Sequence, residues 1–239
     1  MPRKHTKAVI LDFDGTMVDS YQRLHRGMVD GMRKHSKLNK AQFQEWSREF
    51  TFDKFWKHMN WNSYAGEAHG RFGIKLSERE AVALKERIEK SREKSLYDVQ
   101  FYPDVKKALE GFKKRGFTVA LASYSTRERM ETMLEREGML GLVDKGLIFS
   151  KEHSPNRNAR VGKLLGELSK RGITPEECVY VGDMPSDAEA GRANRVKTLI
   201  VRRKMNGRFV IPKGSFKEHK PHRFLKSKRP LLEVAKHMV

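Results

Sequence analysis

The sequence predicts an α/β protein in which a doubly wound parallel sheet is interrupted by an inserted α-helical domain. Short apolar runs that fit buried strands alternate with helical patterns along much of the chain, as in repeated strand–helix units. Three of these runs end in polar residues, which is where a parallel sheet usually carries its site. Between residues 21 and 99 the pattern is helical, with no clear strand. A core domain is therefore predicted over residues 1–20 and 100–239, and a helical cap domain over 21–99.

The first predicted strand, residues 9–11, ends in two carboxylates. Asp12 and Asp14 are two residues apart, so the pleat sends both side chains the same way while Phe13 points back toward the core. Gly15 permits a sharp turn and the close approach of an anion to the backbone. Two carboxylates this close repel each other and lose solvation, so a cation is expected beside them. Mg²⁺ is the natural candidate, because it binds one or two carboxylates together with substrate phosphate oxygens.

Residues 21–99 are predicted to form helices around an aromatic core. Met28 and Met32 recur at helical spacing. Ser77 and Glu80 form a capping box ahead of a long charged helix. Aromatic residues at helical spacing favour a packed core over a base-stacking surface. The aromatic residues of this segment are Phe43, Trp46, Phe50, Phe52, Phe55, Trp56 and Trp61.

The next strand ends in a candidate phosphate-binding hydroxyl. A helix opened by Pro103 leads into a strand over residues 117–122, which ends at Ser123. Ser123 can donate a hydrogen bond to a phosphate oxygen, helped by the following backbone N–H groups. A plain turn or helix-capping serine is the alternative interpretation. The elements expected next are a helix over 127–137 and a strand over 147–150.

A second pair of acids follows a later strand. A capping box over residues 174–177 precedes the apolar run 178–181, which leads to Gly182 and Asp183. Asp187 lies four residues beyond Asp183, so both carboxylates fall on one face of a helical turn. This spacing suits one direct metal ligand and one supporting carboxylate.

The carboxyl-terminal stretch is strongly basic. Residues 202–239 contain twelve Lys or Arg and only two acids, and this surplus is half of the chain's net charge of +20. A short strand over 222–225 and a closing helix over 230–238 are expected there, so the basic residues decorate folded structure. The surplus suits nucleic acid or another polyanion as a partner. A host with generally basic proteins explains it equally well.

Together the three strand ends resemble the haloacid dehalogenase superfamily of phosphotransferases, and the place of the helical insert resembles its phosphoglycolate phosphatase-like branch. Asp12-Phe13-Asp14-Gly15-Thr16 matches the first motif of that family, Asp-x-Asp-Gly-Thr, in full. The resemblance implies that Asp12 is the nucleophile, Asp14 the general acid and base, and Asp183 a magnesium ligand. It also implies that the main-chain carbonyl of Asp14 completes the metal site. The implied substrate-binding residues are Gly15, Thr16, Ser123 and Tyr124, and the implied metal-site residues are Asp12, Asp14, Asp183 and Asp187.

The third motif of that family is a lysine near the start of the helix before the Gly-Asp strand. The register places it at residues 158–160, where this chain has no lysine. Arg160 lies in that window, and Lys163 follows on nearly the same helical face. Lys163 is preferred for its residue type, because a guanidinium is not a simple substitute for an ammonium. Arg160 is kept beside it, and Lys151 is a more distant candidate.

Composition excludes several other classes of protein. The single cysteine, Cys178, excludes a disulfide framework and favours a reducing compartment. No apolar stretch reaches membrane-spanning length, and residues 1–7 lack the apolar segment of a signal peptide. The histidines show no zinc-ligand spacing. A cytoplasmic protein without a membrane partner is therefore expected.

The predicted function is hydrolysis of a small phosphorylated metabolite by a Mg²⁺-dependent phosphatase, through an aspartyl phosphate. A sugar-phosphate mutase uses the same two aspartates and stays open. Dehalogenase activity is disfavoured because halide displacement needs no acid at the position of Asp14. The phosphonate-cleaving members of the family usually lack that acid too. A nucleic-acid-binding protein on the same scaffold, with weak or auxiliary catalysis, is the alternative from a different class.

Overall fold

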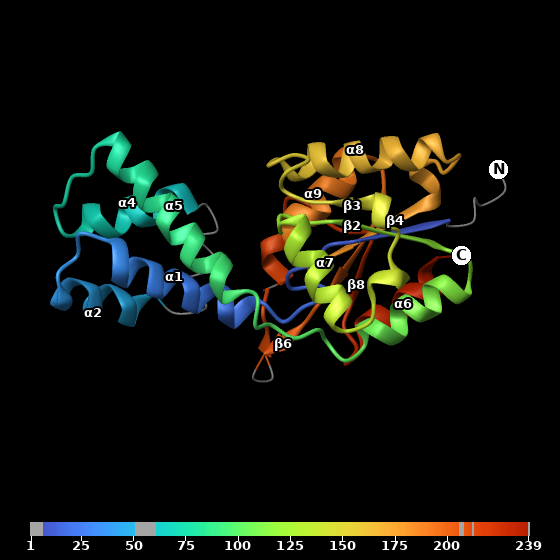
Figure 1. The fold of residues 1–239 in the computed structure, drawn as a ribbon, viewed down its shortest axis with the longest axis horizontal. Helices are drawn as coiled ribbons and strands as arrows, with labels where there is room; N and C mark the ends of the chain where they lie inside the picture. The colour runs from blue at the N-terminus through green and yellow to red at the C-terminus, as the bar shows by residue number, and fades with distance from the viewer. Residues whose placement is uncertain (1–6, 51–60, 206–207, 212, 239) are drawn as a thin grey trace. The chain divides into compact units, whose positions relative to one another are not determined.

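The structure is a computed structural model and describes residues 7–50, 61–205, 208–211 and 213–238. The chain divides into two compact units (Figure 1). One unit joins Met1–Asp19 to Phe101–Val239, and the other is Ser20–Gln100. None of the helices in the described part is both long enough and apolar enough to cross a membrane.

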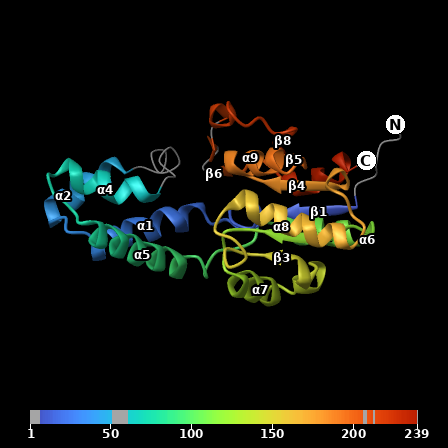
Figure 2. The same cartoon turned by 90° about the horizontal axis from the view of Figure 1, so that it is seen from above.

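The first unit contains a six-stranded parallel sheet. Its strands are β1 (Ala8–Leu11), β2 (Thr118–Ala122), β3 (Ile148–Phe149), β4 (Cys178–Gly182), β5 (Lys197–Val201) and β8 (Arg223–Leu225). Their order across the sheet is β3-β2-β1-β4-β5-β8. Figure 2 shows β3 toward one edge and β8 toward the other. The order reverses direction at β1, so the sheet is doubly wound, as the sequence predicts.

The central strands β1 and β4 are buried along their whole length, which is why both read as continuous apolar runs. In the sheet register, Leu11 lies beside Leu121 on one neighbouring strand and Val181 on the other. The residues just after these three positions therefore meet at one edge. This register carries Asp12 and Asp183 to the same place from strands 170 residues apart in the sequence.

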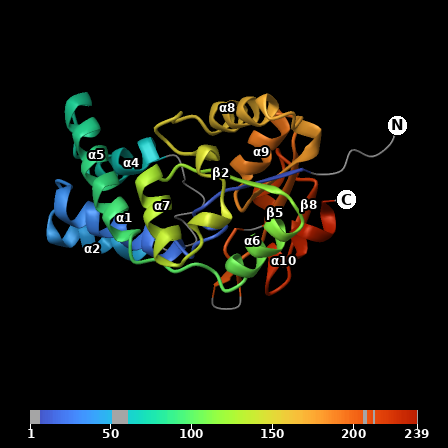
Figure 3. The same cartoon turned by 45° about the vertical axis from the view of Figure 1, so that its right-hand side comes forward.

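Helices cover both faces of the sheet. Those of this unit are α6 (Val105–Lys114), α7 (Arg127–Arg136), α8 (Arg157–Lys170), α9 (Pro185–Ala193) and α10 (Pro230–Val234). Figure 3 shows α8 and α9 on one side of the sheet, and α6 with α10 on the other. On the α8 and α9 side, Ile10 and Tyr180 belong to a buried apolar cluster that includes Leu164 and Leu168. Short 3₁₀ turns occur at Leu140–Leu142, Lys145–Leu147, Pro175–Glu177, Lys213–Phe216 and Ala235–His237.

Two parts of the core differ from the sequence predictions. The patterns do not predict β5 or the small antiparallel pair β6 (Lys204–Met205) and β7 (Arg208–Phe209). The expected closing helix over 230–238 is shorter, because α10 ends at Val234 and a 3₁₀ turn follows.

The second unit is helical throughout the part that the structure describes. Its helices are α1 (Tyr21–His35), α2 (Lys40–Glu49), α4 (Trp61–Arg71) and α5 (Glu78–Ser95). Met28, Met32, Trp46 and Phe50 are buried together in its core, as expected for aromatic residues at helical spacing. Three of the predicted core aromatics, Phe52, Phe55 and Trp56, lie outside the described residues, as does the side chain of Trp61.

The basic carboxyl-terminal stretch is folded, as expected, and it contains β8 and α10. Its basic residues are not all exposed. The Arg203 side chain is only 6% exposed. Its Nη1 lies 2.9 Å from Asp104 Oδ1, and its Nη2 donates to the carbonyl oxygen of Thr16 at 2.7 Å. Its guanidinium carbon also lies 3.9 Å from the centre of the Tyr102 ring. The Arg203 side chain is thus part of the buried core, whereas Lys226 is exposed.

Candidate active site

Three buried carboxylates from two strand ends form the centre of the site. Asp12 follows β1, Asp183 follows β4, and Asp187 lies in the first turn of α9. One oxygen of each carboxylate lies within 4.8 Å of the others. Carboxylates packed this closely repel one another, so the folded chain must supply positive charge or hydrogen-bond donors around them.

The turn after β1 holds the first motif in place. Asp12 is 2% exposed, and its Oδ1 accepts a hydrogen bond from the Phe13 backbone N–H at 2.7 Å. Gly15 has φ of 77°, a conformation that residues with a Cβ rarely adopt. The turn places the Thr16 hydroxyl 2.9 Å from Asp183 Oδ1, so the two motifs are joined directly.

Three donors from β4 and the two residues after it help to fix Asp187. Its Oδ2 accepts from the backbone N–H groups of Asp183 and Met184 at 3.0 and 2.8 Å, and its Oδ1 accepts from the Tyr180 hydroxyl at 2.6 Å. The fit against Gly182 is close, because a Cβ at that residue would lie 2.2 Å from Asp187 Cγ. The packing of Asp187 therefore requires a glycine at the end of β4.

Arg157 is a cation in direct contact with this cluster, and the sequence patterns did not indicate it. Its Nη1 lies 3.0 Å from Asp12 Oδ2 and also donates to Asp187 Oδ1. Burial lowers the pKa of the Arg157 guanidinium, but Asp12 and the other negative groups outweigh this, so the pKa lies above the ordinary arginine value. Arg157 is the first residue of α8, one position before the window over 158–160. The helix-capping residue Asn156 is the sequence signal that could have located this start, since its Oδ1 accepts from the N–H of Ala159 at 3.0 Å.

The two cations preferred from the sequence have other contacts. Lys163 donates to the carbonyl oxygen of His153 at 2.7 Å from an exposed position. Arg160 is buried and donates to the carbonyl oxygen of Ser154 at 2.6 Å, and burial lowers its pKa. The structure therefore brings Arg157 into direct contact with the carboxylates, and shows no such contact for Lys163 or Arg160.

Asp14 belongs to a separate network beside the cluster. Its two carboxylate oxygens accept from the two terminal nitrogens of Arg129, at 2.8 Å for Oδ2 and 3.0 Å for Oδ1. The Ser125 hydroxyl donates to Oδ2 of the same carboxylate. Arg129 lies on α7, so this network ties the first motif to the segment that follows β2. The sequence offered no local signal for Arg129.

The second motif lies at the end of β2, as its strand pattern predicts. Ser123 is buried there, and its N–H donates to the Phe149 carbonyl at 2.9 Å. Its Oγ lies 3.5 Å from the backbone nitrogen of Ser125. Tyr124 is exposed, with its ring 5.9 Å from the guanidinium carbon of Arg160. The role of Ser123 and Tyr124 in substrate binding stays a prediction.

The carboxylate oxygens of the cluster are suitable ligands for a hard divalent cation. Asp12, Asp183 and Asp187 together carry three negative charges, and Arg157 offsets one of them. Their oxygen ligands suit Mg²⁺ better than a metal that prefers sulfur or imidazole. Both the charge balance and the ligand type thus agree with a metal ion at this edge of the sheet.

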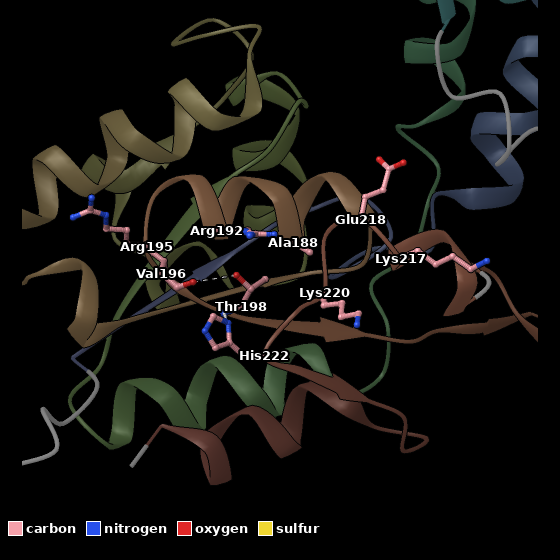
Figure 4. A pocket seen from close by; sticks show the side chains of 10 residues that line it. Ala188, Arg192, Arg195, Val196, Thr198, Lys217, Glu218, Lys220 and His222 are labelled. Carbon is pink, nitrogen blue, oxygen red and sulfur yellow. Dashed lines mark hydrogen bonds between the residues drawn. The ribbon is translucent and has the colours of Figure 1, made fainter.

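A pocket in the core unit lies away from the motif residues. It has a volume of about 590 Å³ and lies among α9, the start of β5 and the segment before β8 (Figure 4). Arg192, Lys220 and His222 are among its lining residues. Arg195 and Lys217 also line it, but their side chains extend in opposite directions in Figure 4. None of the carboxylates described above lines this pocket, so it is separate from the candidate active site.

Comparison with known proteins finds relatives over most of the chain. The phosphoglycolate phosphatase of Nitrosospira multiformis is 29% identical over 188 residues, which cover 78% of this chain and 79% of that protein. A solved structure of a predicted phosphoglycolate phosphatase from Haemophilus somnus covers 98% of both chains, with a TM-score of 0.71 and 19% identity. A solved structure of a proposed β-phosphoglucomutase from Bacteroides vulgatus covers 99% of this chain and 90% of its own, with a TM-score of 0.68 and 17% identity. At these identities the two structures establish a shared fold.

A family model also matches most of the chain. The model for "Haloacid dehalogenase-like hydrolase" matches residues 9–201, which include both acid motifs, Ser123 and the start of α8. Because this match covers well over half of the chain, the protein belongs to the haloacid dehalogenase-like hydrolase family of enzymes.

Proposed function

We propose that this protein is a Mg²⁺-dependent phosphatase that hydrolyses a small phosphate monoester through an aspartyl phosphate on Asp12. The observation that carries the proposal is the cluster of Asp12, Asp183 and Asp187 within 4.8 Å, bridged by the Arg157 guanidinium. A carboxylate can attack phosphorus when nearby positive charge offsets its repulsion from the phosphate dianion.

In the first step, a carboxylate oxygen of Asp12 forms a bond to phosphorus, and the ester P–O bond breaks. The leaving alkoxide takes a proton from Asp14, which lies two residues further along the chain. In the second step, Asp14 accepts a proton from a water molecule as that water attacks the aspartyl phosphate. The bond between phosphorus and Asp12 then breaks, so inorganic phosphate leaves and both aspartates return to their initial states.

Arg157 is proposed to take the role that the family gives to a lysine in its third motif. Arg157 contacts Asp12 directly. Its positive charge therefore reduces the repulsion between Asp12 and the incoming phosphate, and the contact holds the Asp12 carboxylate in its orientation. A Mg²⁺ held by Asp12, Asp183 and the main-chain carbonyl of Asp14, with Asp187 in support, would supply further stabilisation of the phosphoryl charge.

The first substrate to test is 2-phosphoglycolate, because the curated relatives that match most of this chain are named phosphoglycolate phosphatases. The experiment is an assay of phosphate release with Mg²⁺ over a panel of phosphate monoesters. The panel also contains hexose phosphates, mononucleotides and a phosphorylated oligonucleotide. Release from a small monoester, abolished by chelation and restored by Mg²⁺, is the expected result.

Three other outcomes would point elsewhere. Isomerisation of a hexose phosphate without phosphate release would favour a sugar-phosphate mutase. Turnover of the oligonucleotide alone would favour a function on nucleic acid. Full turnover by an Asp12→Asn variant would contradict the covalent mechanism whatever the substrate.

A further inference from the structure

We infer that Arg129 is a positioning residue for Asp14, holding the proton-transfer carboxylate in its catalytic orientation together with Ser125. The inference rests on the proposed function, in which Asp14 protonates the leaving group. Arg129 lies outside all the motifs by which the family was identified, on the helix after the second one. Its proposed action is entirely through Asp14, and it makes no contact with the phosphoryl group.

The first support is the geometry of the ion pair. Two different nitrogens of one guanidinium reach the two oxygens of one carboxylate, at 2.8 and 3.0 Å. A paired contact of this kind fixes the plane of the carboxylate as well as its position, which a single-point contact cannot do. Ser125 contacts both partners, donating to Asp14 Oδ2 and accepting from Arg129 Nη1.

The second support is that Arg129 itself is held rigidly. Its side chain is 3% exposed, so little freedom is left in a residue that is normally among the most flexible. Its backbone N–H donates to the capping hydroxyl of Thr126 at 3.2 Å, in the first turn of α7. Its guanidinium carbon lies 5.4 Å from the centre of the Phe13 ring, the residue between the two aspartates. Through Arg129, the start of α7 therefore holds the Asp14 carboxylate in a fixed position.

A buried ion pair could instead serve only to join α7 to the turn after β1. The two roles differ in how they depend on the leaving group. A general acid matters most when the leaving alkoxide is poor, and little when a nitrophenolate leaves without a proton. A purely structural contact would affect all substrates alike, because it would change the amount of competent enzyme.

The test compares kcat/KM for glycerol 1-phosphate and p-nitrophenyl phosphate in a set of variants and the parent enzyme. Arg129→Met removes the guanidinium and keeps much of the side-chain volume. Asp14→Asn gives the reference pattern for loss of the acid. Arg127→Met is the matched control, since Arg127 lies on the same helix and pairs with Glu131 near the surface. Circular dichroism and the melting temperature establish that each variant is folded.

We expect Arg129→Met to lower kcat/KM for the alkyl ester by roughly 100-fold, the lower end of the effect of a general acid, and for the aryl ester by only about threefold. Arg129→Lys should recover little, because an ammonium cannot span both oxygens. Arg127→Met should leave both substrates near the parent values. Combining Arg129→Met with Asp14→Asn should add less than about threefold to the loss from Asp14→Asn alone, since the two residues act as one unit.

Equal losses on the two esters in Arg129→Met would overturn the inference and leave a structural contact. Additive losses in the double variant would also overturn it, because Arg129 would then act independently of Asp14. The proposed function is tested separately in the same assay. Unchanged turnover of glycerol 1-phosphate by Asp12→Asn would contradict that function, whereas the leaving-group pattern concerns Arg129 alone.

Discussion

The Nη1 atom of Arg157 lies 3.0 Å from the Oδ2 atom of Asp12, which makes this guanidinium the immediate partner of the candidate nucleophile. The same nitrogen donates to Asp187 Oδ1, so one cation bridges the acids contributed by two separate strand ends. This bridge lowers the repulsion within the cluster before any substrate binds. In the proposed function, Arg157 takes the place of the third-motif lysine that the chain lacks at the expected register.

Replacement of Arg157 should therefore be far more harmful than replacement of Lys163. We expect Arg157→Ala to reduce kcat by roughly 100-fold or more, a loss comparable to removing one preorganised transition-state donor. Lys163→Ala is the matched control and should stay within about threefold of the parent, because its contact is with a surface carbonyl. Steady-state phosphate release measures both. The reverse ranking would return the role to Lys163.

Replacing each of the two aspartates of the first motif should reduce turnover to a different extent. Asp12→Asn is expected to abolish turnover, because an amide is a poor nucleophile. Asp14→Asn should retain measurable activity, with a loss of roughly 100- to 10,000-fold from its acid and base roles. Both variants should remain folded by circular dichroism. Activity of Asp12→Asn within tenfold of the parent would contradict the aspartyl phosphate.

Gly182→Ala should disturb the site without replacing any of its carboxylates. The added Cβ would overlap Asp187 Cγ, so Asp187 must move away from its hydrogen-bond donors. We expect a loss of about 1–3 kcal/mol in the free energy of unfolding, typical of overpacking, together with weaker activation by Mg²⁺. The control is Gly166→Ala in α8, where a Cβ meets nothing within 4 Å and should stabilise the helix slightly. Urea unfolding and Mg²⁺ titration of activity measure the two effects.

Arg203 should contribute to stability rather than to binding of a polyanion. Its pair with Asp104 is buried, so Arg203→Met should cost about 3–5 kcal/mol by leaving an uncompensated carboxylate. Adding Asp104→Asn should recover part of that loss, because the amide oxygen can still accept from the Leu231 N–H. Lys226→Met, at an exposed position, is expected to stay within about 0.5 kcal/mol of the parent. Equal losses for Arg203 and Lys226 in urea would refute this assignment.

Nucleic-acid binding by the carboxyl-terminal stretch remains a prediction that salt can test. Filter binding to duplex DNA should show log K falling with log [salt] by about 0.9 per phosphate neutralised. Charge reversal at Lys226 and Lys228 should flatten this slope, with turnover of a small monoester nearly unchanged. Arg203 is excluded from such a variant because of its buried pair. Absence of binding at low salt would leave the basic surplus as a property of the surface alone.

The strands that carry the motifs could be predicted because their signals are local. The apolar run over residues 9–11, the glycine after Asp14 and the spacing of Asp183 and Asp187 are each contained within a few residues. Strand β5 was missed although it lies fully inside the sheet, and its final four residues are buried. No candidate catalytic side chain follows it directly, so nothing beyond its apolar character distinguished it.

The choice among Arg157, Arg160 and Lys163 is a part of the site that the sequence patterns do not determine. An α-helix turns by about 100° per residue, so Arg160 lies roughly 60° and Lys163 roughly 120° around the axis from Arg157, in the same direction. An error of one residue in the start of the helix therefore changes which cation faces the carboxylates. Asn156 fixes the start of α8 by capping it. A register counted back from the following strand does not locate this start to within one residue.

The sequence by itself determined the fold class, the helical insert and the acids at the strand ends, because hydrophobic periodicity and turn chemistry act over short distances. Only the tertiary structure decided which cations meet those acids. Arg157 contacts Asp12 across 145 residues, and Arg129 contacts Asp14 across 115. The packing of whole helices against the sheet decides where long charged side chains lie. The residues next to them in the sequence give almost no information about that packing.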